Sequence, residues 1–284
     1  GGQIASFWCH SLLGDVSYAL HLSRNLGIEH PLIGLEQFHP DGSAQIYDRV
    51  EDLAAAHVAA IQAEDPRGPY DIGGYSMGGI IAFESARQLI EADAQIRSLV
   101  LIDPIMPSTP AWQAIETENI EDYEFDLVAL VLIANALGER WDVKQRISHE
   151  QLSGRDTRSR IEEVSRHLQS GSVKQRSQER IRELVEANHK VITRNNAALE
   201  RYVPHVLSID VPTLFLRASQ GQVGPDNPNQ MPVVGRLHGD PSNGFANYVG
   251  SRLVIKDVDA DHFTICDQKH IGEVARVIKN FWRS

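Results

Sequence analysis

One serine stands among four glycines in the stretch Gly73-Gly74-Tyr75-Ser76-Met77-Gly78-Gly79. The simplest interpretation is a glycine-rich turn, because glycine adopts the positive φ values that tight turns need. The spacing of one glycine two residues before Ser76 and another two residues after it also fits a nucleophile elbow. In this strained strand-to-helix turn the serine hydroxyl is exposed for attack. The first chemistry that the sequence offers is therefore nucleophilic catalysis by Ser76.

The residues on both sides of the motif decide between the two interpretations. Tyr70-Asp71-Ile72 begins a short apolar run before the motif. After it, apolar residues recur at helical spacing, at Ile80, Ile81, Phe83, Ala86, Leu89 and Ile90. Strand, turn and helix thus come in the order that an elbow requires, and we predict that Ser76 is a nucleophile.

A serine nucleophile needs a histidine to take its proton, and the histidine needs an acid that fixes its tautomer. The sequence contains 12 histidines. His262, in Asp261-His262-Phe263, follows an apolar strand and precedes the last helical pattern, which is where the α/β-hydrolase fold places its base. His238 and His270 are weaker candidates because neither follows a strand directly. We therefore predict that His262 is the base.

Two aspartates are candidates for the acid. Asp103 ends the apolar run Ile96–Ile102 that follows the elbow helix, and its alternative role is to cap a turn before Pro104. Asp226 lies in the loop after a later strand, the commoner position in α/β hydrolases, but its neighbours are typical of a simple turn. The sequence favours Asp103 and leaves Asp226 as the alternative.

Alternating strands and helices must position these residues. The remaining strands are predicted at 4–9, 31–35, 211–216 and 251–255, and the remaining helices at 18–26, 46–63 and 271–282. This alternation predicts an α/β fold with a mainly parallel central sheet that is covered by helices on both faces. In this fold the ends of several strands meet at one edge, which would bring Ser76, Asp103 and His262 together.

The alternation stops between residues 107 and 206, where only helical stretches near 120–139, 148–168 and 173–202 are predicted. A helical insertion between sheet strands is most simply a lid over the site at the strand ends. An independent bundle that decorates the fold is the alternative. We expect one domain over 1–284, with a core of 1–106 and 207–284 and a lid of 107–206. A second irregular segment covers 218–247, and its role is open.

Composition excludes several classes of protein. The chain has 284 residues, 42% of them hydrophobic, which suits a packed globular domain. A net charge of −11 argues against nucleic acid as a partner. No apolar run reaches the roughly 18 residues of a membrane span, so a cytoplasmic protein is expected. The two cysteines fit a reducing compartment, with Cys9 read as a buried, inert thiol, and no cluster of residues has metal-ligand spacing.

Four blocks of the sequence together resemble a known family. They are Phe7-Trp8-Cys9-His10-Ser11-Leu12-Leu13-Gly14, the stretch 68–79 around Ser76, Leu99-Val100-Leu101-Ile102-Asp103, and Asp261-His262-Phe263. In this order they resemble the thioesterase domains that terminate polyketide synthases, nonribosomal peptide synthetases and fatty acid synthases. Ser11 and Ala260 depart from the family pattern, which often has proline and glycine at these positions.

The resemblance implies a site and a reaction. It supports Asp103 as the acid, and it places the oxyanion hole at the backbone N–H groups of Met77 and Leu12. The expected function is the transfer of an acyl or peptidyl chain from the phosphopantetheine of a carrier protein to Ser76, with release by hydrolysis or cyclisation. The chain begins at its first predicted strand, so we expect a domain of a larger synthase, with a carrier domain upstream as partner.

Other functions stay open at this point. A free-standing editing thioesterase or a generic serine esterase would use the same three residues on smaller substrates. A catalytically silent α/β hydrolase that serves as a binding module is disfavoured, because Ser76, Asp103 and His262 are all present. No bound cofactor or metal is expected. The sequence leaves the acyl chain and the oligomeric state open, a homodimer included.

Overall fold

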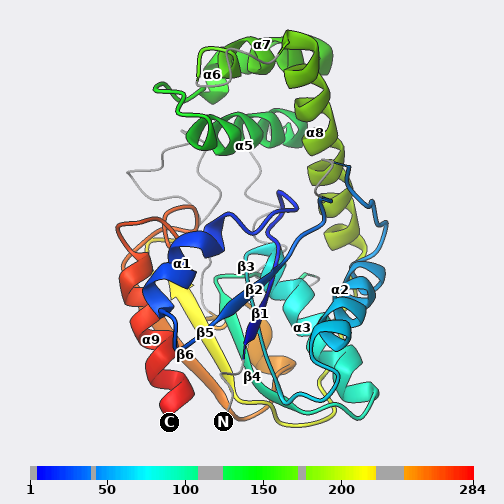
Figure 1. The fold of residues 1–284 in the computed structure, drawn as a ribbon, viewed down its shortest axis with the longest axis vertical. Helices are drawn as coiled ribbons and strands as arrows, with labels where there is room; N and C mark the ends of the chain where they lie inside the picture. Colours follow the sequence, from blue (N-terminus) through cyan, green and yellow to red (C-terminus); the bar gives the residue numbers. More distant parts are fainter. Residues whose placement is uncertain (1–4, 40–42, 108–123, 172–176, 222–239) are drawn as a thin grey trace.

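A computed structural model describes residues 5–39, 43–107, 124–171, 177–221 and 240–284. Its centre is a six-stranded sheet in the order β2-β1-β3-β4-β5-β6 (Figure 1). All five strand pairings are parallel. The strands are β1 (Ser6–Cys9), β2 (Leu32–Leu35), β3 (Tyr70–Tyr75), β4 (Ile96–Ile102), β5 (Thr213–Ala218) and β6 (Leu253–Val258). The predicted α/β fold with a parallel sheet is thereby confirmed.

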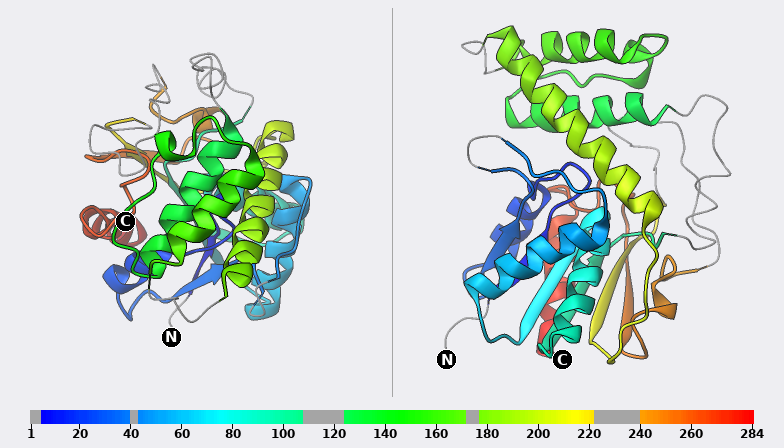
Figure 2. Two further views of the ribbon diagram at one scale, coloured as in Figure 1. Left: turned by 90° about the horizontal axis from the view of Figure 1, so that it is seen from above. Right: turned by 90° about the vertical axis from the view of Figure 1, so that its right-hand side faces the viewer.

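Helices cover both faces of the sheet, as the strand pattern predicted (Figures 1 and 2). Helices α1 (Tyr18–Leu26) and α9 (Ile271–Arg283) pack on one face, and α2 (Val50–Glu64) and α3 (Met77–Glu91) on the other. Because the inner strands are buried on both faces, β3 and β4 consist of almost continuous buried runs. This two-sided core holds the sheet, and hence the ends of its strands, in fixed positions.

The start of α2 differs from the prediction. The apolar pattern predicted a helix from Ile46, whereas α2 begins at Val50 after Arg49, whose backbone is extended. Glu51 and Asp52 lie in its first turn, where carboxylates interact favourably with the helix dipole. Apolar periodicity therefore predicted that α2 exists, and the two carboxylates Glu51 and Asp52 mark its first turn.

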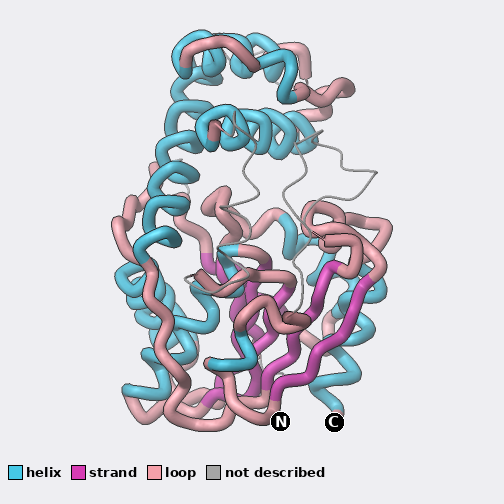
Figure 3. Tube along the Cα trace, turned by 180° about the vertical axis from the view of Figure 1, so that it is seen from behind, coloured by secondary structure: helices cyan, strands magenta, loops and turns pink. Residues whose placement is uncertain are grey.

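A helical segment lies beyond the carboxyl ends of the strands (Figures 1 and 3). It comprises α5 (Phe125–Arg140), α6 (His149–Leu152), α7 (Thr157–Leu168) and α8 (Gln178–Arg201). The helical stretch predicted near 148–168 consists of two separate helices, α6 and α7. Gly154, with φ of 70°, interrupts the chain between them, and Asp156 caps α7 by accepting a hydrogen bond from the Ser159 N–H at 2.7 Å.

Helix α8 belongs to two apolar clusters. It contributes Ile181, Val185 and Ile192 to the cluster inside the helical segment. Its end contributes Ala198 and Leu199 to the cluster between the sheet, α2 and α3. Figure 2 shows α8 running from the helical segment down to the side of the sheet that carries α2. One helix thus joins the helical segment to the core.

Both cysteines are buried free thiols. Burial raises the pKa of Cys9 and of Cys266 far above the usual thiol value, so both stay protonated near neutral pH. This agrees with the interpretation of Cys9 as an inert thiol. Across the described ranges, none of the helices has the length and apolar character that crossing a membrane requires.

Candidate active site

Ser76 occupies a strained turn between β3 and α3. Its φ of 56° and ψ of −126° lie outside the regions that ordinary residues adopt. The neighbouring glycines leave room for this turn. A Cβ at Gly78 would lie 2.5 Å from the Cys9 carbonyl oxygen, and one at Gly74 would overlap the Gly78 carbonyl. The glycines of the motif are therefore required by close backbone contacts, as a nucleophile elbow demands.

Three of the predicted residues meet in one hydrogen-bonded chain. The Ser76 Oγ lies 3.0 Å from Nε2 of His262, and Nδ1 of the same ring lies 2.9 Å from Oδ2 of Asp103. They follow three different strands, β3, β4 and β6, at the same edge of the sheet. With its proton on Nδ1, the His262 ring donates to Asp103 and can accept the Ser76 proton at Nε2.

Asp103 is buried at the end of β4, with only 1% of its surface exposed. Burial raises the pKa of its carboxyl group, while His262, the Ala218 N–H and the Asn243 side chain act in the opposite direction. The Ala218 N–H donates to Oδ1 at 3.0 Å, so each carboxylate oxygen has its own partner. This arrangement fixes the carboxylate and, through it, the orientation of the imidazole.

The turn that carries His262 is held on several sides. Oδ1 of Asp261 accepts hydrogen bonds from the N–H groups of Phe263 and Thr264, each at 2.9 Å. The Tyr75 hydroxyl donates to the His262 carbonyl at 2.6 Å, and the His262 N–H donates to the Gly221 carbonyl at 2.9 Å. The rings of Tyr75 and Phe263 lie 5.1 and 5.3 Å from the imidazole. These contacts limit the movement of His262.

The loop after β1 lies against the first turn of α3, as the Gly78 contact with Cys9 shows. Met77 begins α3, where backbone N–H groups have no partner within the helix. The Ser11 carbonyl accepts from the His10 Nδ1 at 2.7 Å and from the Gly14 N–H at 3.0 Å. Leu12 donates its N–H to no other residue in the described part of the chain. Both predicted oxyanion donors are therefore backbone groups near the elbow, and their role stays a prediction.

The other sequence candidates are not in this cluster. Asp226 and His238 lie outside the described residues. His270 precedes α9 as its N-cap, and its backbone donates to Asp267. Sequence reasoning missed Tyr75, Asn243 and the Ala218 N–H. Only Tyr75 gave a local signal, because it stands next to the serine in the motif; the others come from more than a hundred residues away along the chain.

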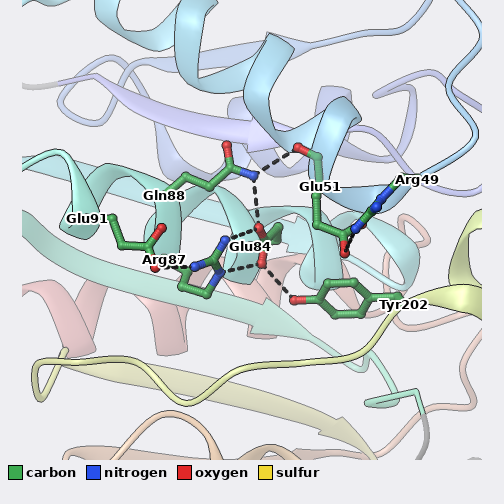
Figure 4. Close-up of polar contacts among 7 residues, drawn as sticks. All are labelled: Arg49, Glu51, Glu84, Arg87, Gln88, Glu91 and Tyr202. Atoms are coloured by element: carbon green, nitrogen blue, oxygen red, sulfur yellow. Dashed lines mark hydrogen bonds and ion pairs between the residues drawn. The ribbon is translucent and has the colours of Figure 1, made fainter.

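The buried carboxylate of Glu84 fixes α3, the helix that follows the elbow (Figure 4). Glu84 of α3 is fully buried, and the Arg87 guanidinium donates to both of its oxygens at 2.8 Å. The Gln88 side chain also donates to Glu84, at 2.9 Å, and to the Glu51 carbonyl of α2. The Tyr202 hydroxyl, directly after α8, completes the group at 2.9 Å. This network joins α3, which begins at the elbow, to α2 and to the end of α8.

Comparison with known proteins finds a family match and related sequences. Residues 7–131 match the model of the thioesterase domain family. Over 80 residues, 28% of this chain, the sequence is 46% identical to the non-reducing polyketide synthase crz7 of Cladonia metacorallifera. Over 100 residues, 35% of this chain, it is 33% identical to enterobactin synthase component F of Escherichia coli (strain K12). The matched stretches span 4% and 8% of these curated relatives.

Solved structures with the same fold extend the likeness over nearly the whole chain. A four-domain nonribosomal peptide synthetase, holo-AB3403 bound to AMP and glycine, matches 98% of this chain with a TM-score of 0.74 and 22% identity, over 19% of its own chain. The NocB thioesterase domain from the nocardicin cluster matches 100% of this chain and 96% of its own, with a TM-score of 0.60 and 17% identity. At these identities the likeness concerns the fold.

The family match, the relatives and the parallel sheet agree with one another and with the resemblance that the four sequence blocks carried. The chain has the α/β-hydrolase fold, and over residues 7–131 it is similar to the thioesterase domains of polyketide synthases and nonribosomal peptide synthetases.

Proposed function

We propose that this chain is a chain-releasing thioesterase, with Ser76 as nucleophile, His262 as general base and Asp103 as the acid that orients it. The observation that carries the proposal is the unbroken chain of contacts from Ser76 Oγ to His262 and on to Asp103, at 3.0 and 2.9 Å. Distances of this size suit proton transfer, and the order along the sequence is the one that α/β hydrolases use.

The first half of the reaction transfers the acyl group to the enzyme. Nε2 of His262 takes the Ser76 proton while Oγ attacks the thioester carbonyl, and the negative charge develops on the carbonyl oxygen. The N–H groups of Met77 and Leu12 stabilise that charge, because fixed backbone dipoles need no reorganisation during the reaction. The tetrahedral intermediate collapses, the carbon–sulfur bond breaks, and the imidazolium returns the proton to the departing thiolate.

The second half releases the chain from Ser76. His262 removes a proton from water or from a nucleophile on the chain itself, which attacks the ester carbonyl, and Ser76 Oγ leaves with the returned proton. Water gives a free acid, and an internal nucleophile gives a ring. Because both products arise from the same acyl-Ser76 ester, the fold of the bound chain decides between them.

The helical segment acts as a lid in this proposal. It lies at the carboxyl ends of the strands, where Ser76, Asp103 and His262 are also found (Figure 1). Ligands of open α/β sheets bind at this edge. Helix α5 presents a largely buried apolar sequence, with Leu127, Leu130 and Val131 in the cluster of the segment. The segment would exclude water from the ester and select among acyl chains.

The substrate of this proposal arrives on a carrier protein. The relatives named above are synthases in which the matched stretch is 4% and 8% of the length, and the similar solved synthetase has four domains. We therefore propose that the acyl or peptidyl chain is held as a thioester of carrier-bound phosphopantetheine. The thiol of that arm is the leaving group, and the arm is substrate and not a resident cofactor.

The test compares one acyl group in three forms: octanoyl on the phosphopantetheine of a carrier protein, octanoyl-pantetheine, and p-nitrophenyl octanoate. A chain-releasing thioesterase should give its highest kcat/KM with the carrier-bound thioester, with the free acid identified by mass. A generic esterase would prefer the p-nitrophenyl ester and gain nothing from the carrier. A fourth substrate, acetyl on the same carrier, identifies an editing enzyme, which would prefer it to octanoyl on that carrier. Either of these last results contradicts the proposal.

A further inference from the structure

The loop 11–14 lies between two apolar clusters. Leu12 packs both against the cluster of the sheet, α2 and α3 and against the cluster of the helical segment. Leu13 packs against the second of these. The position of the Leu12 N–H therefore depends on both regions of the molecule at once.

A hydrogen bond crosses from α8 to this loop. Asn195 is fully buried on α8, and its Nδ2 donates to the Leu12 carbonyl at 3.1 Å and to Oε1 of Gln37 at 2.9 Å. Gln37 in turn donates from Nε2 to the Gln45 carbonyl at 2.7 Å. This last bond leaves Oε1 of Gln37 facing Asn195, so both protons of the Asn195 amide have an acceptor. The orientation of the two amides is thus fixed by their partners.

Close packing holds α8 against the same loop. Gly14 has a φ of 82°, and a Cβ there would lie 2.8 Å from Cγ1 of Val191. The Gln37 N–H donates to the Gly14 carbonyl at 2.9 Å, which joins the loop to the residues after β2. The end of α8 is fixed independently by the bond from Tyr202 to Glu84 (Figure 4). Ile192 still belongs to the cluster of the helical segment, whereas Val191 and Asn195 of α8 pack against the loop of the core.

We propose that Asn195 is a positioning residue for the oxyanion hole. This inference rests on the proposed function. The side-chain amide of Asn195 fixes the peptide between Leu12 and Leu13 through its bond to the Leu12 carbonyl. The His10 ring and the Gly14 N–H fix the preceding peptide through the Ser11 carbonyl. With both peptides held, the Leu12 N–H keeps one direction, and preorganised direction is what makes a backbone donor effective toward a developing oxyanion.

The experiment compares Asn195→Asp and Asn195→Ala with the native chain, using p-nitrophenyl octanoate. The expected result is a fall in kcat of about tenfold with KM nearly unchanged, because the lost interaction acts on the transition state. Asn195→Asp keeps the shape but has no donor while it is ionised. Its kcat, relative to the native chain at the same pH, should rise as the pH is lowered and the carboxyl group regains a proton that it can donate.

The matched control is Asn196→Ala, because Asn196 is partly buried on the same helix and its side chain donates to Glu200 on that helix at 2.7 Å. Its kcat should equal that of the native chain. Thermal unfolding separates a folding defect from a positioning defect, since Asn195→Asp measured well below its Tm must still show the pH-dependent ratio. The positioning role is overturned if kcat is unchanged in both Asn195 variants, or if the ratio of the Asn195→Asp kcat to the native kcat does not change with pH. Either result leaves the proposed function standing. Absence of turnover of octanoyl on the carrier protein by the native chain overturns both.

Discussion

The sheet core and the helical segment place their polar groups in different ways. In the core, charged groups such as Glu84 and Asp103 are buried, and each is held by several fixed donors. In the helical segment, many ion pairs join exposed residues one helical turn apart, such as Arg158 with Glu162 and Arg180 with Glu183. Exposed pairs of this kind contribute little to stability. The helical segment also buries one charged side chain, Arg160, which donates to Asp126 at 3.0 Å and to the Leu152 carbonyl at 3.2 Å, so the two regions differ in degree.

Helix α8 belongs to both regions. Its first half shares the apolar cluster of the helical segment, whereas its second half carries Asn195 and leads into Tyr202, which both bond to the core. A lid that moved as one body would have to break these bonds. We therefore expect substrate-dependent motion to be confined to residues before Val191.

The largest expected effect is at the nucleophile. Ser76→Ala should lower kcat roughly a millionfold and leave the unfolding transition nearly unchanged, because the hydroxyl contributes chemistry and little packing. Turnover and labelling by a fluorophosphonate, followed by mass spectrometry of peptides, measure the effect. Labelling of another residue at an undiminished rate in this variant would show that the core holds a different nucleophile.

The next largest effect is at the acid. Asp103→Asn should lower kcat by roughly 10⁴, because an amide cannot hold the His262 tautomer that accepts the Ser76 proton. The matched control is Asp257→Asn, since Asp257 is an exposed carboxylate of β6 that pairs with Arg217. It should leave kcat unchanged. A larger loss in Asp226→Asn than in Asp103→Asn would move the acid to the segment outside the described residues.

The sequence predicted the parts of the site that depend on local backbone. The elbow glycines, the strand that ends at Asp103 and the strand that precedes His262 all have short-range signatures, and the structure brings their three residues together. Asn195 and Glu84 could not be predicted in this way. Each is a polar residue in a helical pattern, where solvent exposure is the usual expectation, and their partners are set by tertiary packing across distant parts of the chain.

The third prediction concerns the pH dependence of the unfolding free energy and the two histidines beside the loop 11–14. Burial lowers the pKa of His10 from 6.5 to about 4, and burial also lowers the pKa of His57, whose ring lies 5.1 Å from it. Asp15 acts in the opposite direction on His10. At about 1.4 kcal/mol per pKa unit, the His10 shift corresponds to about 3 kcal/mol. The unfolded chain binds the extra protons, so this stability is complete above pH 6.5 and is lost as the pH falls toward 4.

Urea unfolding between pH 8 and pH 4 measures the combined loss from both histidines, and His57→Phe removes the part that His57 contributes. The variant should have a shallower dependence of unfolding free energy on pH, because the phenyl ring fills a similar space and binds no proton. His205→Phe, at an exposed histidine, is the matched control and should keep the native slope. Equal slopes in the native chain and in His57→Phe would mean that His57 is not held neutral by the core.

The smallest effect tests whether the two regions unfold together. Tyr202→Phe removes the hydroxyl that donates to Glu84 at 2.9 Å, while Arg87 and Gln88 keep their bonds to that carboxylate. Loss of one bond to a buried charge costs about 1–3 kcal/mol, and the remaining donors place the expected loss near the lower figure. Because α8 belongs to both apolar clusters, the loss should appear in a single unfolding transition, seen equally in urea melts followed by far-ultraviolet circular dichroism and by tryptophan fluorescence. Tyr248→Phe provides the comparison, since Tyr248 is only partly buried and packs at the edge of the same cluster. Two separate transitions in the native chain, with only one of them shifted by Tyr202→Phe, would show that the helical segment folds apart from the core.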